Sequence, residues 1–148
     1  MSPSEAEIRA LLNAYCSRLD AGDFDGVAEL FRDGVFRSPR GTNLVGADAV
    51  RSQYDAVIRY DDGTPRTKHV LGTIVVEVDD DAGTAAARCA FTVYQAAGAP
   101  LQPVLTGRYH DQFERVDGSW VWRERFVHPD LEGDLSRHMQ ARSASEEG

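Results

Sequence analysis

The sequence predicts an α+β fold, in which about three N-terminal helices cover one face of a curved, mixed or antiparallel sheet. Apolar residues recur at helical spacing in the first 60 residues, and from residue 67 onward they alternate with polar residues as in β-strands. Helices followed by a run of strands are typical of the α+β class. We expect a single domain over residues 1–131, followed over 132–148 by a polar C-terminal tail of the kind that often frays.

The first helix is expected to run from the N-terminus to the Ala-Gly-Asp sequence at 21–23. Ser2 or Ser4 can cap its start, and Pro3 suits a position in the first turn. Gly22 can adopt the left-handed conformation that ends a helix. The apolar stripe of this helix consists of Ile8, Leu11, Leu12, Tyr15 and Leu19.

Two further helices and two short strands are expected before residue 60. Asp23 can cap a short second helix that carries Phe24 on its inward side. The short strands are expected at 35–38 and 42–45, on either side of a Pro-Arg-Gly turn. The third helix is expected from about residue 47 to residue 59.

Four long strands are expected at 67–78, 84–95, 105–115 and 119–127. An Asp-Gly pair at 117–118 predicts a tight hairpin between the last two. Strict alternation places Trp120, Trp122 and Phe126 on one face of the last strand and Arg125 on the other. Because both faces of the sheet carry apolar residues and helices cover one of them, we expect a homodimer that forms through the sheet.

The composition argues against several classes of protein. The formal net charge of −8 is unfavourable for a nucleic-acid or anionic membrane surface, which bind through clustered Lys and Arg. No apolar run reaches the ~18 residues that a membrane span needs. The N-terminus lacks the basic start and apolar core of a signal peptide, so we expect a cytoplasmic protein. Cys16 and Cys89 are expected to be small core residues.

The histidines do not show the spacing of a metal site. No His-x-His or His-x3-His motif is present, and His69 and His110 lie on separate predicted strands with no reason to converge. The sequence also lacks a glycine-rich phosphate loop, a CxxC pair and a GxSxG motif. We therefore expect neither a metal nor an organic cofactor.

Asp20 and His69 are the strongest candidates for a catalytic pair. A carboxylate in the last turn of a helix meets the negative end of the macrodipole, which costs a few tenths to ~1 kcal/mol unless a cation compensates. His69 opens the first long strand on a mainly apolar face. Together the two would form a base that is oriented by an acid. Separately, Asp20 would be a solvated turn residue and His69 an ordinary core histidine.

Other candidates carry two interpretations each. Arg125 is either an electrostatic clamp on a substrate oxygen or part of a surface or rim ion pair with Glu124 or Asp111. Tyr54 and Tyr109 are either hydroxyl donors in a pocket or ordinary aromatic core residues.

The chain resembles the SnoaL-like branch of the nuclear-transport-factor-2-like superfamily. The first helix ends in Y-x4-D-x2-D (Tyr15, Asp20, Asp23), followed by LFRDGVF at 30–36. Gly46 precedes the third helix, and the histidine of KHVLG opens the first long strand. The last match is GRYHDQFERVDGSWVWRER at 107–125. This resemblance implies a conical α+β barrel with a cystatin-like fold.

The resemblance is strongest to the dehydratase and dehydrohalogenase type, which includes scytalone dehydratase and bile-acid 7α-dehydratase. It implies that His69 removes a proton and that Asp20 orients it. Tyr15 matches an acid or hydrogen-bond donor, and Arg125 matches a strand-end arginine. The second active-site histidine of scytalone dehydratase has no counterpart on the next strand of this chain. The implied substrate is a small hydrophobic cyclic or polyketide-like molecule, in a pocket lined by Tyr15, Phe24, Tyr54, Leu71 and Tyr109.

Three functions remain open on these grounds. The first is a dehydratase-like lyase or an isomerase that needs no cofactor, and the second is a SnoaL-like aldol cyclase of polyketides. The third is a non-catalytic module that binds a small molecule or dimerises, in which Asp20 and His69 form a structural pair.

Overall fold

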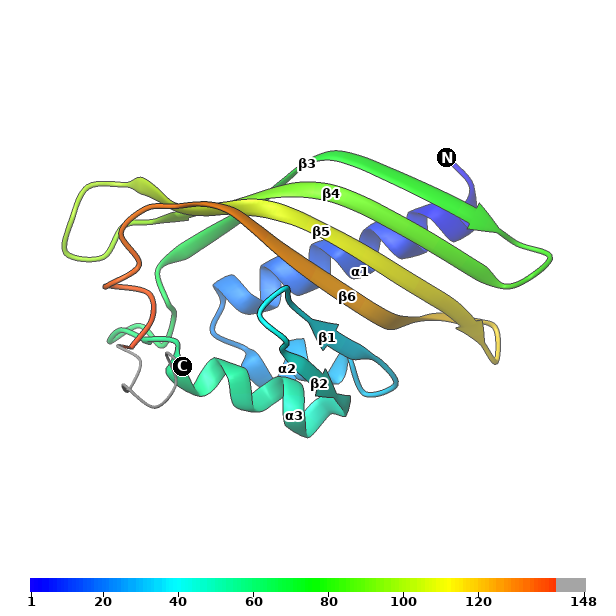
Figure 1. The fold of residues 1–148 in the computed structure, drawn as a ribbon, viewed down its shortest axis with the longest axis horizontal. Helices are drawn as coiled ribbons and strands as arrows, with labels where there is room; N and C mark the ends of the chain where they lie inside the picture. The colour runs from blue at the N-terminus through cyan, green and yellow to red at the C-terminus, as the bar shows by residue number, and fades with distance from the viewer. Residues whose placement is uncertain (141–148) are drawn as a thin grey trace.

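A computed structural model describes residues 1–140, in which helices pack beneath a curved sheet of six strands (Figure 1). The elements follow in the order α1 (Pro3–Asp20), α2 (Phe24–Glu29), β1 (Val35–Arg37), β2 (Asn43–Val45), α3 (Gly46–Ser52), a 3-10 helix η1 (Gln53–Ala56), β3 (Thr67–Asp79), β4 (Thr84–Gln95), β5 (Gln102–Val116) and β6 (Ser119–Glu132). Within the described residues, no helix combines the length and the apolar character that crossing a membrane requires.

The end of α1 is held tightly against the chain that leads into β3. Ser2 caps the start of the helix by accepting a hydrogen bond from the Glu5 N–H. Gly22 ends it with a φ of 77°, as expected for a left-handed stop. A Cβ at position 22 would lie 2.2 Å from the carbonyl oxygen of Gly63, so only glycine allows this approach. The contact brings the last turn of α1 next to the first residues of β3.

The sheet is mixed and unclosed, with the strand order β2-β1-β6-β5-β4-β3. Strand β1 runs parallel to β6, and all other neighbours are antiparallel. This confirms the expected α+β fold with a curved mixed sheet. In Figure 1 the long strands arch over α1, while α2, α3 and the short strands lie on the same side.

The third helix is shorter than its apolar pattern predicted. It ends at Ser52, continues as η1 and stops before Val57, whereas a helix to Arg59 was expected. Val57 instead forms an isolated antiparallel bridge with Met139. β-Branched residues such as Val57 and Ile58 favour the extended backbone of such pairing over a helix.

A β-bulge in β6 reverses the predicted face of Arg125. Gln112 of β5 pairs with Glu124, but Phe113 pairs with Trp122, so Arg123 is an extra residue in β6. The extra residue shifts the alternation by one. Arg125 therefore lies on the inner face with Trp122, and the prediction that they lie on opposite faces was wrong.

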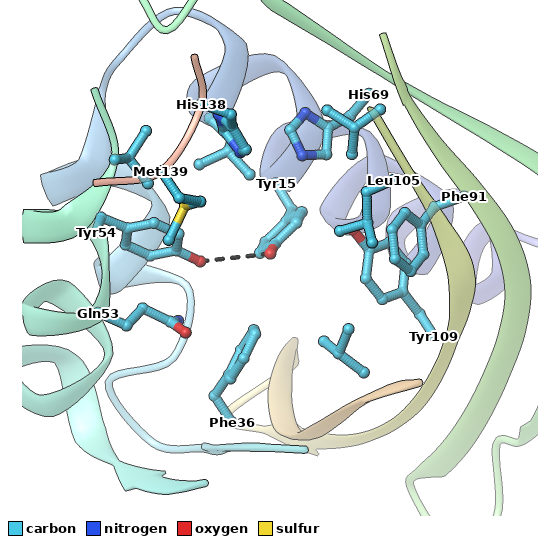
Figure 2. A pocket seen from close by; sticks show the side chains of 14 residues that line it. Tyr15, Phe36, Gln53, Tyr54, His69, Phe91, Leu105, Tyr109, His138 and Met139 are labelled. Carbon is cyan, nitrogen blue, oxygen red and sulfur yellow. Dashed lines mark hydrogen bonds between the residues drawn. The ribbon is translucent and has the colours of Figure 1, made fainter. Parts of the chain in front are cut away.

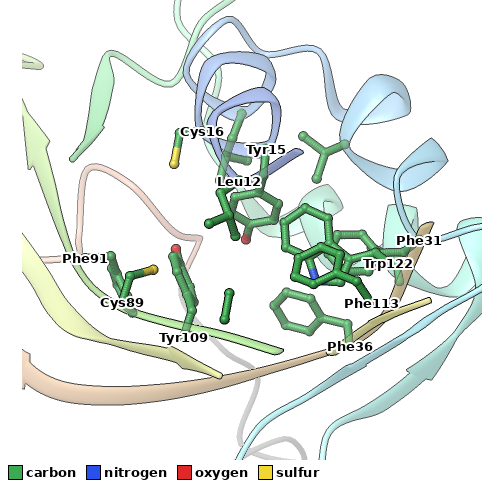
Figure 3. Packing of buried hydrophobic residues seen from close by; sticks show 14 of the residues in the cluster. Leu12, Tyr15, Cys16, Phe31, Phe36, Cys89, Phe91, Tyr109, Phe113 and Trp122 are labelled. Carbon is green, nitrogen blue, oxygen red and sulfur yellow. The ribbon is translucent and has the colours of Figure 1, made fainter. Parts of the chain in front are cut away.

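The inner face of the sheet and α1 enclose an aromatic core. Figure 3 shows Tyr15 of α1 meeting Tyr109, Phe113 and Trp122 of the sheet. Cys16 and Cys89 are free and buried in this core, as expected. Burial raises the pKa of each thiol to about 11, so both stay protonated.

The segment after β6 is packed rather than frayed. Strand β6 extends to Glu132, and the chain then turns back to the loop after η1. The Ile58 N–H donates to the His138 carbonyl at 2.9 Å, and the Gln140 N–H donates to the Ala56 carbonyl at 2.8 Å. Leu135 and Met139 pack on the core. The expectation of a frayed tail does not hold for 132–140, and residues 141–148 lie outside the described part of the chain.

Candidate active site

Asp20 and His69 form a direct contact, which we call the dyad. The ring Nδ1 of His69 lies 2.6 Å from Asp20 Oδ1. The His69 backbone N–H donates to Asp20 Oδ2 at 2.9 Å, and the Thr67 hydroxyl donates to Oδ1 at 3.0 Å. The His69 side chain is 5% exposed and the Asp20 side chain 17%. Asp20 is therefore a partner of β3 and not a solvated turn residue.

The dyad exists because a helix end and a strand start meet. Asp20 is the last residue of α1, and His69 is the third residue of β3. The carboxylate accepts three hydrogen bonds from β3, which compensate for its unfavourable position at the helix end. A carboxylate at Nδ1 favours the tautomer with a proton on that atom, and the other ring nitrogen, Nε2, can then accept one.

His69 lines a cavity of about 140 Å³ between the sheet and the wall made by η1 and the C-terminal segment. Figure 2 shows Tyr54, Gln53 and Met139 on one side and Phe91, Leu105 and Tyr109 on the other. The complete lining consists of Tyr15, Leu19, Phe36, Gln53, Tyr54, Val57, His69, Phe91, Val93, Leu105, Tyr109, Val127, His138 and Met139.

The structure brings some of the expected pocket residues together and leaves others outside. Tyr15, Tyr54 and Tyr109 line the cavity with His69. Phe24 does not line it but stacks against Tyr54, with ring centroids 5.3 Å apart. Leu71 is also outside the lining and packs, partly buried, against the core. The placement of Phe24 and Leu71 in the pocket was thus wrong.

Two tyrosine hydroxyls meet in the middle of the cavity. The hydroxyl oxygens of Tyr15 and Tyr54 lie 3.4 Å apart (Figure 2). Burial raises the pKa of both phenols. The positive charge of Arg125 lowers these pKa values, but its effect is smaller than that of burial. The two groups are therefore neutral hydroxyls, which can donate hydrogen bonds to an oxygen of a ligand.

Arg125 lies behind the tyrosines and does not line the cavity. It is fully buried, and its Nε and Nη2 donate to Asp111 at 2.8 and 3.0 Å. The guanidinium carbon lies 3.6 Å from the ring centroid of Tyr109 and 4.3 Å from that of Tyr15. Burial opposes its charge, but Asp111 outweighs this effect and raises the pKa of Arg125. The expected ion pair with Asp111 thus exists, but in the core rather than at the rim.

The sequence interpretation missed the residues that η1 and the C-terminal segment contribute. Gln53 and His138 both line the cavity. The side-chain atoms Nε2 of Gln53 and Nδ1 of His138 are buried and have no hydrogen-bond partner in residues 1–140. Burial, with a smaller effect of His69, lowers the pKa of His138 to about 4. The only local signal was the pair of apolar residues Leu135 and Met139 in an otherwise polar tail.

Candidate metal ligands do not cluster in the described part of the chain. No group of three His, Cys, Asp or Glu side chains within residues 1–140 lies close enough to hold a metal ion. The rings of His110 and His128 lie next to each other, with centroids 4.8 Å apart and planes tilted by 56°, on the outer face of the sheet and away from His69.

Solved structures with the same fold come from several bacteria. Rv3472, a protein of unknown function from Mycobacterium tuberculosis, is 27% identical, with 86% of this chain and 76% of that chain covered and a TM-score of 0.71. Aln2 from a Streptomyces species is 25% identical, with 88% of this chain and 94% of that chain covered and a TM-score of 0.70. An NTF2-like protein with a cystatin-like fold from Novosphingobium aromaticivorans is 23% identical, with 90% of this chain and 85% of that chain covered and a TM-score of 0.71.

No curated protein is similar enough to this chain to match it. A family model described as SnoaL-like domain matches residues 1–125, which include α1, the sheet as far as Arg125 and both members of the dyad. The protein has the cystatin-like fold of the Novosphingobium aromaticivorans structure. The chain belongs to the SnoaL-like domain family.

Proposed function

We propose that this protein is a cofactor-independent acid–base enzyme of the dehydratase type, which acts on a small cyclic substrate through the Asp20–His69 dyad. The observation that carries the proposal is the 2.6 Å contact between the His69 ring and the Asp20 carboxylate at the wall of a mainly apolar cavity. A histidine that is oriented in this way is a suitable general base near neutral pH.

The volume of the cavity supports a substrate with a single ring. A cavity of about 150 Å³ in an apolar protein core holds one molecule of benzene, and this cavity measures about 140 Å³. Phe91, Val93, Leu105 and Val127 offer an apolar surface to a ring. This size argues against an aldol cyclase that acts on a multi-ring polyketide.

The polar groups of the cavity favour a substrate that carries oxygen atoms. The neutral hydroxyls of Tyr15 and Tyr54 can donate hydrogen bonds to a hydroxyl or carbonyl oxygen. A carbonyl group acidifies the hydrogen on the neighbouring carbon, which a histidine can then remove. Cyclic β-hydroxyketones combine these features and are the substrate class that we propose.

The proposed reaction is the loss of water from such a ketone. His69 Nε2 takes the proton from the carbon next to the carbonyl, and the electron pair of that C–H bond forms the new double bond. The bond from the β-carbon to the hydroxyl oxygen breaks, and the imidazolium returns the proton to the leaving oxygen. The products are an enone and water, and the dyad is restored. An isomerase would use the same base and return the proton to another carbon.

Dehydration of 3-hydroxycyclohexanone gives 2-cyclohexenone, whose ultraviolet absorbance tests the proposal directly. We expect turnover by the unmodified protein and a loss of about 10²–10⁴-fold in His69→Gln, the range that general base catalysis contributes. Asp20→Asn should also lower the rate, because the amide no longer fixes the ring tautomer. His110→Gln is the matched control, since His110 is an exposed histidine on the outer face of the sheet.

Two results would contradict the proposal. One is that the unmodified protein converts single-ring β-hydroxyketones no faster than His69→Gln does. The other is that these compounds bind to the cavity and are never converted, which would support the non-catalytic binding module instead.

We also propose that two copies associate through the outer face of the sheet. Val70 and Val75 of β3, Tyr94 of β4 and Leu131 of β6 all have exposed side chains. Burial of such apolar surface favours association. Light scattering should give twice the mass of one chain, and Tyr94→Lys should shift the protein towards the monomer. A monomer at micromolar concentration would exclude this dimer.

A further inference from the structure

The C-terminal segment after β6 forms part of the wall of the cavity. Backbone hydrogen bonds tie it to Ala56, the last residue of η1, and to Ile58. The Gln95 amide of β4 and the Tyr60 hydroxyl both donate to the carbonyl oxygen of Arg137. These four contacts from different parts of the chain fix the backbone on both sides of His138.

The side chain of His138 points to the same end of the cavity as His69 (Figure 2). It is 8% exposed, and its Nδ1 has no hydrogen-bond partner in residues 1–140. A buried polar nitrogen without a partner is destabilising and rare in folded proteins. Strand β4, which pairs with β3, offers only Phe91 and Val93 to this cavity, so the second polar group at this end, beside His69, comes from the C-terminal segment.

The ring of His138 is neutral at neutral pH. Burial lowers its pKa to about 4, and the neighbouring His69 adds to this effect, while Asp20 acts in the opposite direction. A neutral imidazole carries one N–H donor. Such a ring can polarise a carbonyl group without transferring its proton, as neutral histidines in other enzymes do.

We propose that His138 is a substrate-binding residue of this site, whose neutral imidazole donates a hydrogen bond to the carbonyl oxygen of a cyclic ketone. The catalytic part of this proposal rests on the proposed function, whereas the binding part does not. Negative charge develops on the carbonyl oxygen when His69 removes the neighbouring proton. A donor placed at such an oxygen contributes about 10²–10³-fold to kcat.

The binding part is tested with two ligands that differ in one atom group. Cyclohexanone and methylenecyclohexane have the same ring, with an oxygen in the first where the second has a CH₂ group. The ratio of the dissociation constant of methylenecyclohexane to that of cyclohexanone, measured by NMR titration, isolates the contribution of the oxygen. We expect this ratio to fall by about 3- to 10-fold in His138→Leu, the value of one neutral hydrogen bond.

Two variants control for effects on folding. His138→Asn keeps an N–H donor and should retain part of the preference for the ketone. Met139→Leu changes the adjacent lining residue without changing a polar group, so the ratio should stay constant.

The outcomes separate the two proposals. A ratio that is unchanged in His138→Leu, or that falls equally in Met139→Leu, overturns the role of His138 whether or not the protein is an enzyme. A ratio that falls only in His138→Leu supports this role even if no variant converts 3-hydroxycyclohexanone, in which case only the proposed function fails. Where turnover is seen, kcat should fall about 100-fold in His138→Leu and recover in part in His138→Asn.

Discussion

The buried ion pair between Asp111 and Arg125 gives the sharpest prediction about stability. Asp111 accepts hydrogen bonds from Arg125 at 2.8 and 3.0 Å and from the Trp122 indole at 3.1 Å. Both charged side chains are completely buried. Asp111→Asn removes the negative charge and leaves the guanidinium in the core without a charged partner. Breaking a buried pair by loss of one partner costs about 3–5 kcal/mol.

The lower end of that range applies here. The amide introduced by Asp111→Asn keeps one oxygen that can accept a hydrogen bond from Arg125, and the contacts of the guanidinium with the aromatic rings are present before and after the change. We therefore expect the free energy of unfolding to fall by about 3 kcal/mol. This is a large part of the roughly 5–15 kcal/mol by which a domain of this size is usually stable.

A second ion pair on the same two strands provides the control. Asp130 accepts hydrogen bonds from Arg108 at 3.0 to 3.3 Å, but these side chains are 41% and 50% exposed. Exposed pairs contribute about 0–1 kcal/mol, so Asp130→Asn should change the free energy of unfolding by no more than that. Urea denaturation measures both variants, provided that the slope with urea is unchanged. Equal losses in Asp111→Asn and Asp130→Asn would refute the argument from burial.

Three other expectations follow from the same structure. Because the pKa of His138 is 6.5 in an ordinary setting and about 4 in the fold, the unfolded chain binds more protons between these values. The free energy of unfolding should thus fall by about 3 kcal/mol from pH 7 to pH 4, and urea denaturation across this range should show a weaker fall in His138→Gln. Gly22→Ala should destabilise the protein by more than about 1 kcal/mol, since the Cβ would meet the Gly63 carbonyl at a positive φ; a melting temperature equal to that of the unmodified protein would contradict this. Tyr54→Phe should raise the KM for cyclic β-hydroxyketones by about 3- to 10-fold if the hydroxyl binds substrate, whereas an unchanged KM would place the hydroxyl outside the binding site.

Local signals in the sequence were sufficient for both ends of the first helix, the start of the second and the positions of the four long strands, and they singled out Asp20 and His69. Caps and stops such as Ser2, Gly22 and Asp23 act within a few residues, so they can be recognised without the fold. Asp20 stood out because a carboxylate at the end of a helix needs a partner, and the structure shows His69 in that position. The long strands could be predicted because apolar and polar residues alternate in them with a period of two residues, which can also be recognised without the fold.

Only the tertiary structure decided which side chains share the cavity. The bulge at Arg123 moved Arg125 to the inner face, and it depends on how β5 and β6 pair rather than on the residues of β6 alone. The packing of His138 against the cavity depends on hydrogen bonds to Ala56 and Ile58, which are about 80 residues earlier in the chain. Such contacts between distant segments leave no periodic pattern in the sequence, because each segment has its own local preferences and the pairing is selected by the whole fold.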